Sequence, residues 1–118
     1  MILVCGGLGG VMAAACAGAA EGGGLSVGFL PGSDRTEGNE YLTVALPTGV
    51  GELRNGLVVR ASDAVIAIGG SWGTLSEIAL ARRTGTPVVT IGGWTIEGQP
   101  GPTARSAADA VAQALALI

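Results

Sequence analysis

The sequence predicts an α/β fold in three layers, with helices on both faces of a doubly wound parallel sheet. Short apolar runs alternate with helical patterns along the chain, which is typical of consecutive strand–helix–strand units. Glycine-rich turns follow several of the apolar runs, at the points where a strand of such a fold passes into its helix. The chain has 118 residues, so we expect a single domain over residues 1–118.

The first half of the chain predicts three strands and two helices. An alanine-rich stretch follows the first glycine turn and ends at Gly22 to Gly24, which stop a helix. A polar loop at residues 31–40 is long enough to have a function of its own. Pro47 to Gly49 mark the turn into the second helix. The expected strands cover residues 2–5, 25–30 and 41–46, and the expected helices cover residues 11–21 and 51–61.

The second half predicts two more strands and two more helices. Gly85 and Pro87 end the first of these helices, because glycine caps a helix and proline cannot continue one. A loop rich in glycine and proline, residues 92–102, precedes the last helix. The expected strands cover residues 63–68 and 87–91, and the expected helices cover residues 75–84 and 104–117.

The charged residues exclude several kinds of chemistry. The formal net charge is −3, and all six basic side chains are Arg, with no Lys and no His. A pyridoxal-phosphate enzyme needs a Schiff-base lysine, a Walker A site needs its lysine, and the familiar catalytic triads and many zinc sites need histidine. A chain without a basic face is also poorly suited to nucleic acid. We therefore expect no nucleic-acid partner and no metal.

The cysteines and the N-terminal segment indicate a cytoplasmic protein. Cys5 and Cys16 lack the spacing of metal ligands, so we expect reduced, buried thiols. Glycines interrupt the apolar N-terminal segment, which also lacks the basic start of a signal peptide. No apolar run approaches the roughly 20 residues that a membrane span needs, so we expect no membrane partner.

The first glycine turn, residues 6–10, is a candidate phosphate-binding segment. Its candidate ligand-binding residues are Gly7, Gly9, Gly10 and Met12. Met12 stands where a dinucleotide fingerprint has its third glycine, so the turn is a weak match to that motif. Two interpretations remain open. The backbone contacts a phosphate there, or the glycines only supply the positive φ of a tight turn.

The second glycine turn, residues 69–73, predicts an anion site. It joins an apolar run to a helix, and a helix N-terminus has unpaired N–H groups and a favourable dipole for anions. A second interpretation is a capping box, with Thr74 as N-cap and Glu77 reaching back to it, and spacing alone favours this one. Trp72 either stacks on a base or covers the loop. The candidate binding residues here are Gly70, Ser71, Trp72, Gly73 and Thr74.

Arg54 and Asn55 open the helix after the third strand, at the same edge of the sheet as the glycine turns. An arginine beside an anion site is suited to recognising phosphate. The alternative is an exposed arginine at a helix end with no ligand.

These motifs together resemble the Lonely Guy family, which is also known as "lysine decarboxylase-like" and contains phosphoribohydrolases. Residues 69–77 are similar to its PGGxGTxxE motif, and residues 6–12 are similar to its first glycine-rich motif. Arg54-Asn55 resembles that family's Arg-Lys pair and matches a sister branch with Arg-Asn, which contains molybdenum cofactor carrier proteins. The chain departs from the hydrolase pattern at Gly69, Ser71 and Asn55, where that pattern has Pro, Gly and Lys.

The resemblance implies a Rossmann-like nucleotide-binding domain that forms a homodimer or a higher homo-oligomer. It also implies that this chain is short at its N-terminus, since family members carry a further strand and helix before the segment that begins at Ile2. The implied partner is a small, phosphorylated, nucleotide-like ligand. No cofactor is required for such binding, and the expected ligand is a nucleotide or a molybdopterin-type molecule.

Three functions remain open on this evidence. The first is binding of the phosphorylated ligand at the glycine turns, as in a molybdenum cofactor carrier-like protein. The second is cleavage of the N-glycosidic bond of nucleoside 5′-monophosphates, of the cytokinin-activating type. The resemblance then makes Glu77 the catalytic carboxylate and Arg54 its assistant, in chemistry that needs neither His nor metal. The third is an inactive or structural fragment. Decarboxylation of lysine with pyridoxal phosphate is excluded by the missing lysine.

Overall fold

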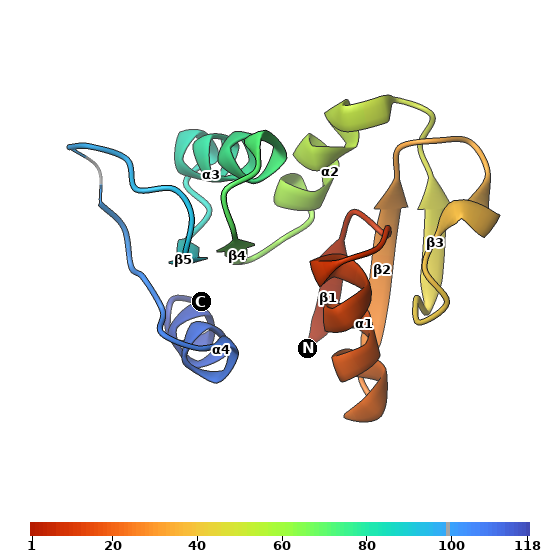
Figure 1. Ribbon diagram of the computed structural model, residues 1–118, viewed down its shortest axis with the longest axis horizontal. Coiled ribbons are helices and arrows are strands. Elements are labelled where there is room, and N and C mark those ends of the chain that lie inside the picture. Colours follow the sequence, from red (N-terminus) through yellow and green to blue (C-terminus); the bar gives the residue numbers. More distant parts are fainter. Residues whose placement is uncertain (99) are drawn as a thin grey trace. The chain divides into compact units, whose positions relative to one another are not determined.

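The strands pair in parallel in both halves of the chain, as their alternation with helices predicts. The computed structural model describes residues 1–98 and 100–118 (Figure 1). It divides into two compact units, residues 1–61 and residues 62–118, which are described separately below. The predicted single domain over residues 1–118 stays a prediction.

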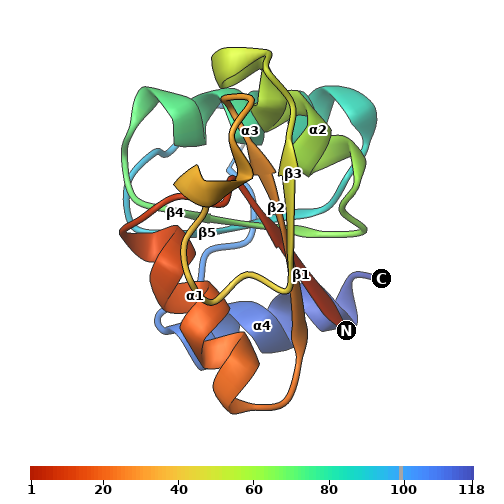
Figure 2. The same ribbon diagram turned by 90° about the vertical axis from the view of Figure 1, so that its right-hand side faces the viewer.

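Unit 1 contains a parallel sheet in the order β1-β2-β3, which runs from left to right in Figure 1, and Figure 2 looks onto the β3 edge of this sheet. Val27 of β2 lies opposite Val4 of β1 and Val44 of β3. The alanine-rich sequence of α1 has high helix propensity, and its Cys16 packs against Cys5 of β1. The elements of this unit are β1 (Ile2–Cys5), α1 (Val11–Glu21), β2 (Leu25–Leu30), η1 (Arg35–Glu37), β3 (Val44–Pro47), η2 (Gly51–Leu53) and α2 (Arg54–Arg60).

Unit 2 contains the parallel pair β4-β5, with α3 and α4 on opposite sides of it in Figure 1. Val89 of β5 and Ala110 and Ala114 of α4 form a buried apolar cluster. Ile78 and Ala81 of α3 are also buried. Helices thus cover both faces of this strand pair. The elements of this unit are β4 (Val65–Ile68), α3 (Trp72–Thr84), β5 (Val88–Ile91) and α4 (Ala107–Ala116).

Several predicted boundaries are wrong by a few residues, for identifiable reasons. The third strand begins at Val44 and not at residue 41, because Tyr41 and Thr43 contact β2 through hydrogen bonds of the Ser26 and Thr43 hydroxyl groups. The Ser26 hydroxyl donates to the Tyr41 carbonyl at 3.3 Å, and the Thr43 hydroxyl accepts from the Ser26 amide at 3.0 Å. The helix expected at residues 51–61 starts with the 3-10 turn η2 and continues as α2.

In unit 2 the fourth strand begins at Val65 and not at residue 63, and the last helix is shorter than residues 104–117. The Ala104 amide donates to the Thr90 carbonyl at 2.8 Å, so this segment runs beside β5 in extended form. The helix begins only after Ser106, whose hydroxyl accepts from the Asp109 amide.

Cys5 and Cys16 are free and buried, with their sulfur atoms 3.5 Å apart. Burial raises the pKa of the Cys5 thiol from 9.0 to about 11, against the opposing effect of the Gly7 amide, which donates to its sulfur. Since the thiolate is the reactive form, this thiol is held in an unreactive state at neutral pH.

We expect the folded protein to react with an aromatic disulfide reagent at pH 7 much more slowly than the same protein in urea. Because the unfolded thiol ionises at a lower pH than the folded one, the contribution of Cys5 to stability is complete below pH 9.0 and is lost as the pH rises to about 11. Absorbance of the released reagent measures the first effect, and urea unfolding at several pH values measures the second. Rapid labelling of the folded protein would contradict the assignment of an inert thiol.

Candidate functional site

The first glycine turn leads into a helix that has no side-chain cap. The N-cap of α1 is Gly10, at φ 64° and ψ −132°, a conformation that only glycine adopts readily. In the described part of the chain no side chain bonds to the first turn of α1, and that turn holds no acidic residue. The N–H groups of Val11 and Met12 are therefore available to an external anion.

The guanidinium of Arg54 lies directly over this turn. A Cβ atom on Gly6 would stand 2.7 Å from Arg54 Nη2 and 2.9 Å from the sulfur of Met12. Nη1 of Arg54 donates to the Oδ1 of Asn55. The buried Nε of Arg54 has no hydrogen-bond acceptor among residues 1–98 and 100–118. The structure thus brings Arg54, Asn55 and Met12 together beside the first glycine turn.

Asn39 holds the first glycine turn in place and was not predicted as a site residue. Its amide donates to the Gly7 carbonyl at 2.9 Å, and its side-chain Nδ2 donates to the Leu8 carbonyl at 3.0 Å. Asn39 belongs to the polar loop at residues 31–40, which the sequence had indicated as functional. Its effect is to fix the conformation of the turn.

Gly9 has no structural explanation within the described residues. No described atom lies within 4 Å of the Cβ position, and Gly9 does not have the positive φ of Gly10. Positive φ therefore accounts for some glycines of this turn and not for Gly9. A side chain at this position would meet no described atom.

The second glycine turn is shorter than predicted, and the capping box is wrong. Helix α3 begins at Trp72, and its N-cap is Ser71, whose hydroxyl accepts from the Thr74 amide at 3.1 Å. Gly73 and Thr74 therefore lie inside the helix. Glu77 is three residues too far along to bond back to the N-cap, because a capping box needs its carboxylate at the third helical position. Capping thus does not explain the half-buried Glu77.

The start of α3 keeps two open amides. The N–H groups of Trp72 and Gly73 have no acceptor within the part of the chain that the structure describes. The Thr74 hydroxyl is 2.9 Å from the Ser71 hydroxyl and donates to the Ile68 carbonyl at 3.5 Å. The Ser71 side chain therefore caps the helix and leaves the first two amides to an external acceptor.

The glycines after β4 and β5 are in direct backbone contact. The Gly69 amide donates to the Ile91 carbonyl at 3.1 Å, and a Cβ atom on Gly93 would stand 1.9 Å from the Gly69 carbonyl oxygen. Trp94 comes next, and its indole Nε1 donates to the Ser71 carbonyl at 2.8 Å. Sequence reasoning did not identify Trp94. The signal was a second Gly-Gly pair directly after the neighbouring strand.

The remaining features add no further site. A small hollow of about 30 Å³ lies between Trp94, Arg82 and Thr103. Among residues 1–98 and 100–118, no three His, Cys, Asp or Glu side chains are grouped to hold a metal ion. In the same residues, no helix combines the length and the apolar character that crossing a bilayer requires.

Comparisons with known proteins relate this chain to one family and one group of structures. Residues 1–116 match the model of the SLOG cluster4 family. An uncharacterized protein of Archaeoglobus fulgidus is 42% identical over 90 residues, which are 76% of this chain and 59% of that protein. The chain therefore spans about three fifths of that relative's length.

Solved structures give the same picture. The molybdenum cofactor binding protein of the phototrophic bacterium Rippkaea orientalis matches with a TM-score of 0.89 at 32% identity, over 98% of this chain and 77% of that chain. The molybdenum cofactor carrier protein of Chlamydomonas reinhardtii matches with a TM-score of 0.84 at 31% identity, over 98% and 77% of the two chains. These matches confirm the predicted Rossmann-like α/β fold, in a chain shorter than theirs.

Proposed function

Because the chain belongs to the SLOG cluster4 family, we propose that it binds a phosphorylated, nucleotide-like ligand as a molybdenum cofactor carrier-like protein. Two structurally similar proteins are described as a molybdenum cofactor binding protein and a molybdenum cofactor carrier protein. That cofactor is a molybdenum-bearing pterin with a phosphate group. Its phosphate has the chemistry that an uncapped helix N-terminus accepts.

The observation that carries the proposal is the position of Arg54 over Gly6. Its guanidinium and the sulfur of Met12 both lie beside Gly6, next to a helix whose first amides are open. Its buried Nε has no acceptor in the described residues, and a buried charged donor is costly unless an anion pairs with it. Gly7, Gly9 and Gly10 would supply backbone contacts to the phosphate, with Asn55 orienting Arg54.

The start of α3 is proposed as a second anion-binding position, in unit 2. Its donors are the amides of Trp72 and Gly73, at the positive end of the helix dipole. Ser71 and Thr74 shape this position through their mutual hydrogen bond. Gly70 leaves the approach free, since the nearest described atom to its Cβ position is 3.6 Å away, on Gly93.

The proposed oligomer is a homodimer or a higher homo-oligomer. The register of unit 1 places four half-exposed apolar side chains on one face of its sheet. A contiguous apolar surface of this kind is typical of an interface. These side chains are Ile2 (57% exposed), Leu25 (52%), Val44 (43%) and Leu46 (40%).

The carrier function is tested by what stays bound to the protein after expression in a host that makes the cofactor. We expect molybdenum, measured by mass spectrometry, and a fluorescent pterin, measured after oxidation, to elute with the protein in gel filtration. Arg54→Ala is expected to weaken retention about ten- to a hundredfold, the effect of losing a charged hydrogen bond. Arg60→Ala is the matched control, because Arg60 is exposed at the other end of the same helix. Equal retention by both variants would overturn the role of Arg54.

Hydrolysis of nucleoside 5′-monophosphates is the alternative that one observation favours. Glu77 lies half-buried on α3, the helix whose first amides form the second proposed anion-binding position. Incubation with AMP distinguishes the two functions. Release of adenine that Glu77→Gln abolishes would assign hydrolase activity to the chain. A folded protein that neither retains the cofactor nor releases adenine would favour a structural role.

A further inference from the structure

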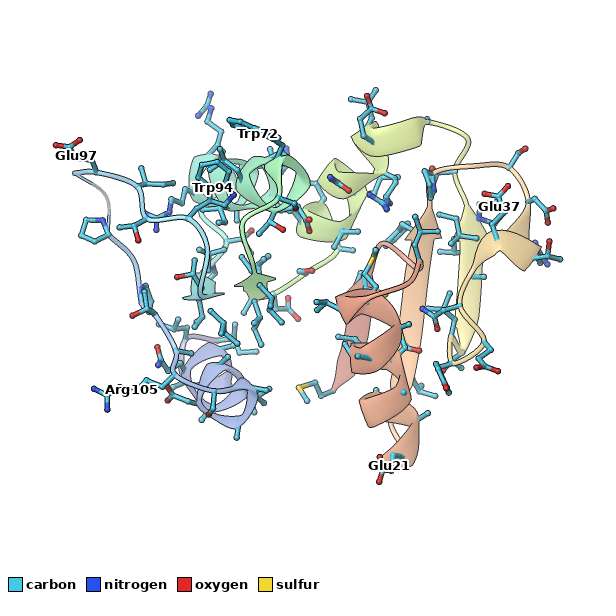
Figure 3. All side chains as sticks on the ribbon, in the orientation of Figure 1. Glu21, Glu37, Trp72, Trp94, Glu97 and Arg105 are labelled. Atoms are coloured by element: carbon cyan, nitrogen blue, oxygen red, sulfur yellow. The ribbon has the colours of Figure 1, made fainter. Side chains whose placement is uncertain are left out.

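The two tryptophans of this chain meet at the start of α3. The chain has only two Trp, one Tyr and one Phe, so half of its aromatic residues are gathered at one place. The indole rings of Trp72 and Trp94 have their centres 5.1 Å apart, with a tilt of 45° between the planes. Figure 3 shows the two side chains next to α3. They come from different segments, the first residue of the helix and the loop after β5.

Trp94 is anchored to the N-cap residue of α3. Its Nε1 donates to the Ser71 carbonyl at 2.8 Å, which ties the ring to the N-cap residue of α3. The preceding residue, Gly93, lies against the backbone of Gly69 and leaves no room for a side chain. The position of Trp94 relative to the helix start is therefore fixed by one hydrogen bond and one close backbone contact.

Trp72 gains little from folding, since 77% of its surface stays exposed. Burial of apolar area is the main stabilising contribution of a large aromatic side chain, and most of it is missing here. Its contact with the tilted ring of Trp94 leaves most of the indole surface open to a flat partner.

We infer that Trp72, supported by Trp94, stacks on the ring of the bound ligand, and that this ring is a fused nitrogen heterocycle of the pterin or purine class. The inference rests on the proposed function, because the stacked ring is the second part of a ligand whose first part is the phosphate. The amide and the indole of Trp72 belong to one residue, so a single compact ligand reaches both. Stacking on an aromatic side chain contributes about 1–3 kcal/mol per base and accepts any flat heterocycle.

The test compares phosphates with and without a ring, using the intact protein. Isothermal calorimetry measures the affinities of AMP, neopterin monophosphate and ribose 5-phosphate. We expect at least one of the two ring-bearing phosphates to bind at least about tenfold more tightly than ribose 5-phosphate. Because both tryptophans belong to the pair, the intrinsic fluorescence reports on it directly, and we expect AMP to quench that fluorescence while ribose 5-phosphate does not.

Variants of Trp72 separate stacking from other contributions. Trp72→Ala is expected to lose about ten- to a hundredfold in affinity for the tighter ring-bearing phosphate and to keep its affinity for ribose 5-phosphate. Trp72→Phe keeps a flat ring and is expected to recover most of the loss. Circular dichroism checks that both variants are folded, which the exposure of Trp72 leads us to expect.

The outcomes distinguish this inference from the function on which it rests. Equal affinities for ring-bearing and ringless phosphates, or an unchanged affinity in Trp72→Ala, would overturn stacking and leave phosphate binding intact. Failure of all three phosphates to bind would overturn the proposed function, and the stacking role with it.

Discussion

Replacing Gly93 with alanine is expected to unfold the second unit of the protein. The new Cβ atom would stand 1.9 Å from the Gly69 carbonyl oxygen and 2.8 Å from the Gly70 nitrogen. Both are backbone atoms of the turn that opens α3, so they cannot move without displacing the helix start. We expect a loss of at least about 4 kcal/mol, which belongs to the rare, severe class of substitutions. That is a large share of the roughly 5–15 kcal/mol that stabilises a typical domain.

Gly98→Ala is the matched control for this prediction. Gly93 and Gly98 have the same positive φ of 76°, and no described atom lies within 4 Å of the Cβ position at Gly98. Its cost is therefore the conformational one alone, about 1–2 kcal/mol. Urea unfolding followed by circular dichroism compares the two variants. Similar losses would show that the contact between the turns contributes little to stability.

Replacing Gly6 with alanine is expected to damage binding while leaving the fold intact. The new Cβ atom would collide with the guanidinium of Arg54 and the sulfur of Met12, which are the far ends of flexible side chains. These groups can move aside at a cost of less than about 1 kcal/mol in stability. Arg54 would then leave its position over the first glycine turn. We expect the affinity for the phosphorylated ligand to fall about ten- to a hundredfold, as for the loss of a charged hydrogen bond.

Gly18→Ala provides the comparison within the same unit. Gly18 lies inside α1 with no described atom near its Cβ position, so alanine there is expected to raise stability by about 0.5–1 kcal/mol without affecting binding. Retention of the cofactor, measured as for Arg54→Ala, compares the binding of the two variants. Normal binding by Gly6→Ala would mean that the ligand does not depend on where Arg54 lies.

The sequence predicted the order and type of the strands and helices, because alternating apolar runs and glycine turns are local signals. The resemblance to the Rossmann-like Lonely Guy relatives, near the branch of molybdenum cofactor carrier proteins, is confirmed by the family match and the structural neighbours. The N-cap of α3 was predicted at Thr74 because Thr74 and Glu77 have the spacing of a capping box. Ser71 has an equally good capping side chain, and it is the N-cap in the structure. The sequence alone does not show which of Ser71 and Thr74 caps the helix.

Contacts between distant residues could not be predicted in the same way. The position of Arg54 over Gly6 depends on the packing of α2 in unit 1, which no local pattern encodes. The contact between Gly69 and Gly93 follows from the register of the strands before them, in which Ile68 lies opposite Ile91. With that register known, the two glycine pairs are neighbours and Trp94 is placed beside Ser71. The register itself is a tertiary property.

The absence of a side-chain cap at the N-terminus of α1 affects the stability of the protein without ligand. Helices α3 and α4 each complete their first turn with a serine of their own, at Ser71 and Ser106, whereas α1 has only Gly10 at that position. A phosphate bound there would accept hydrogen bonds from the open amides of α1 and so act as a reversible N-cap. Ligand binding and folding are then coupled. Every tenfold rise in free ligand above its Kd adds about 1.4 kcal/mol to the free energy of unfolding.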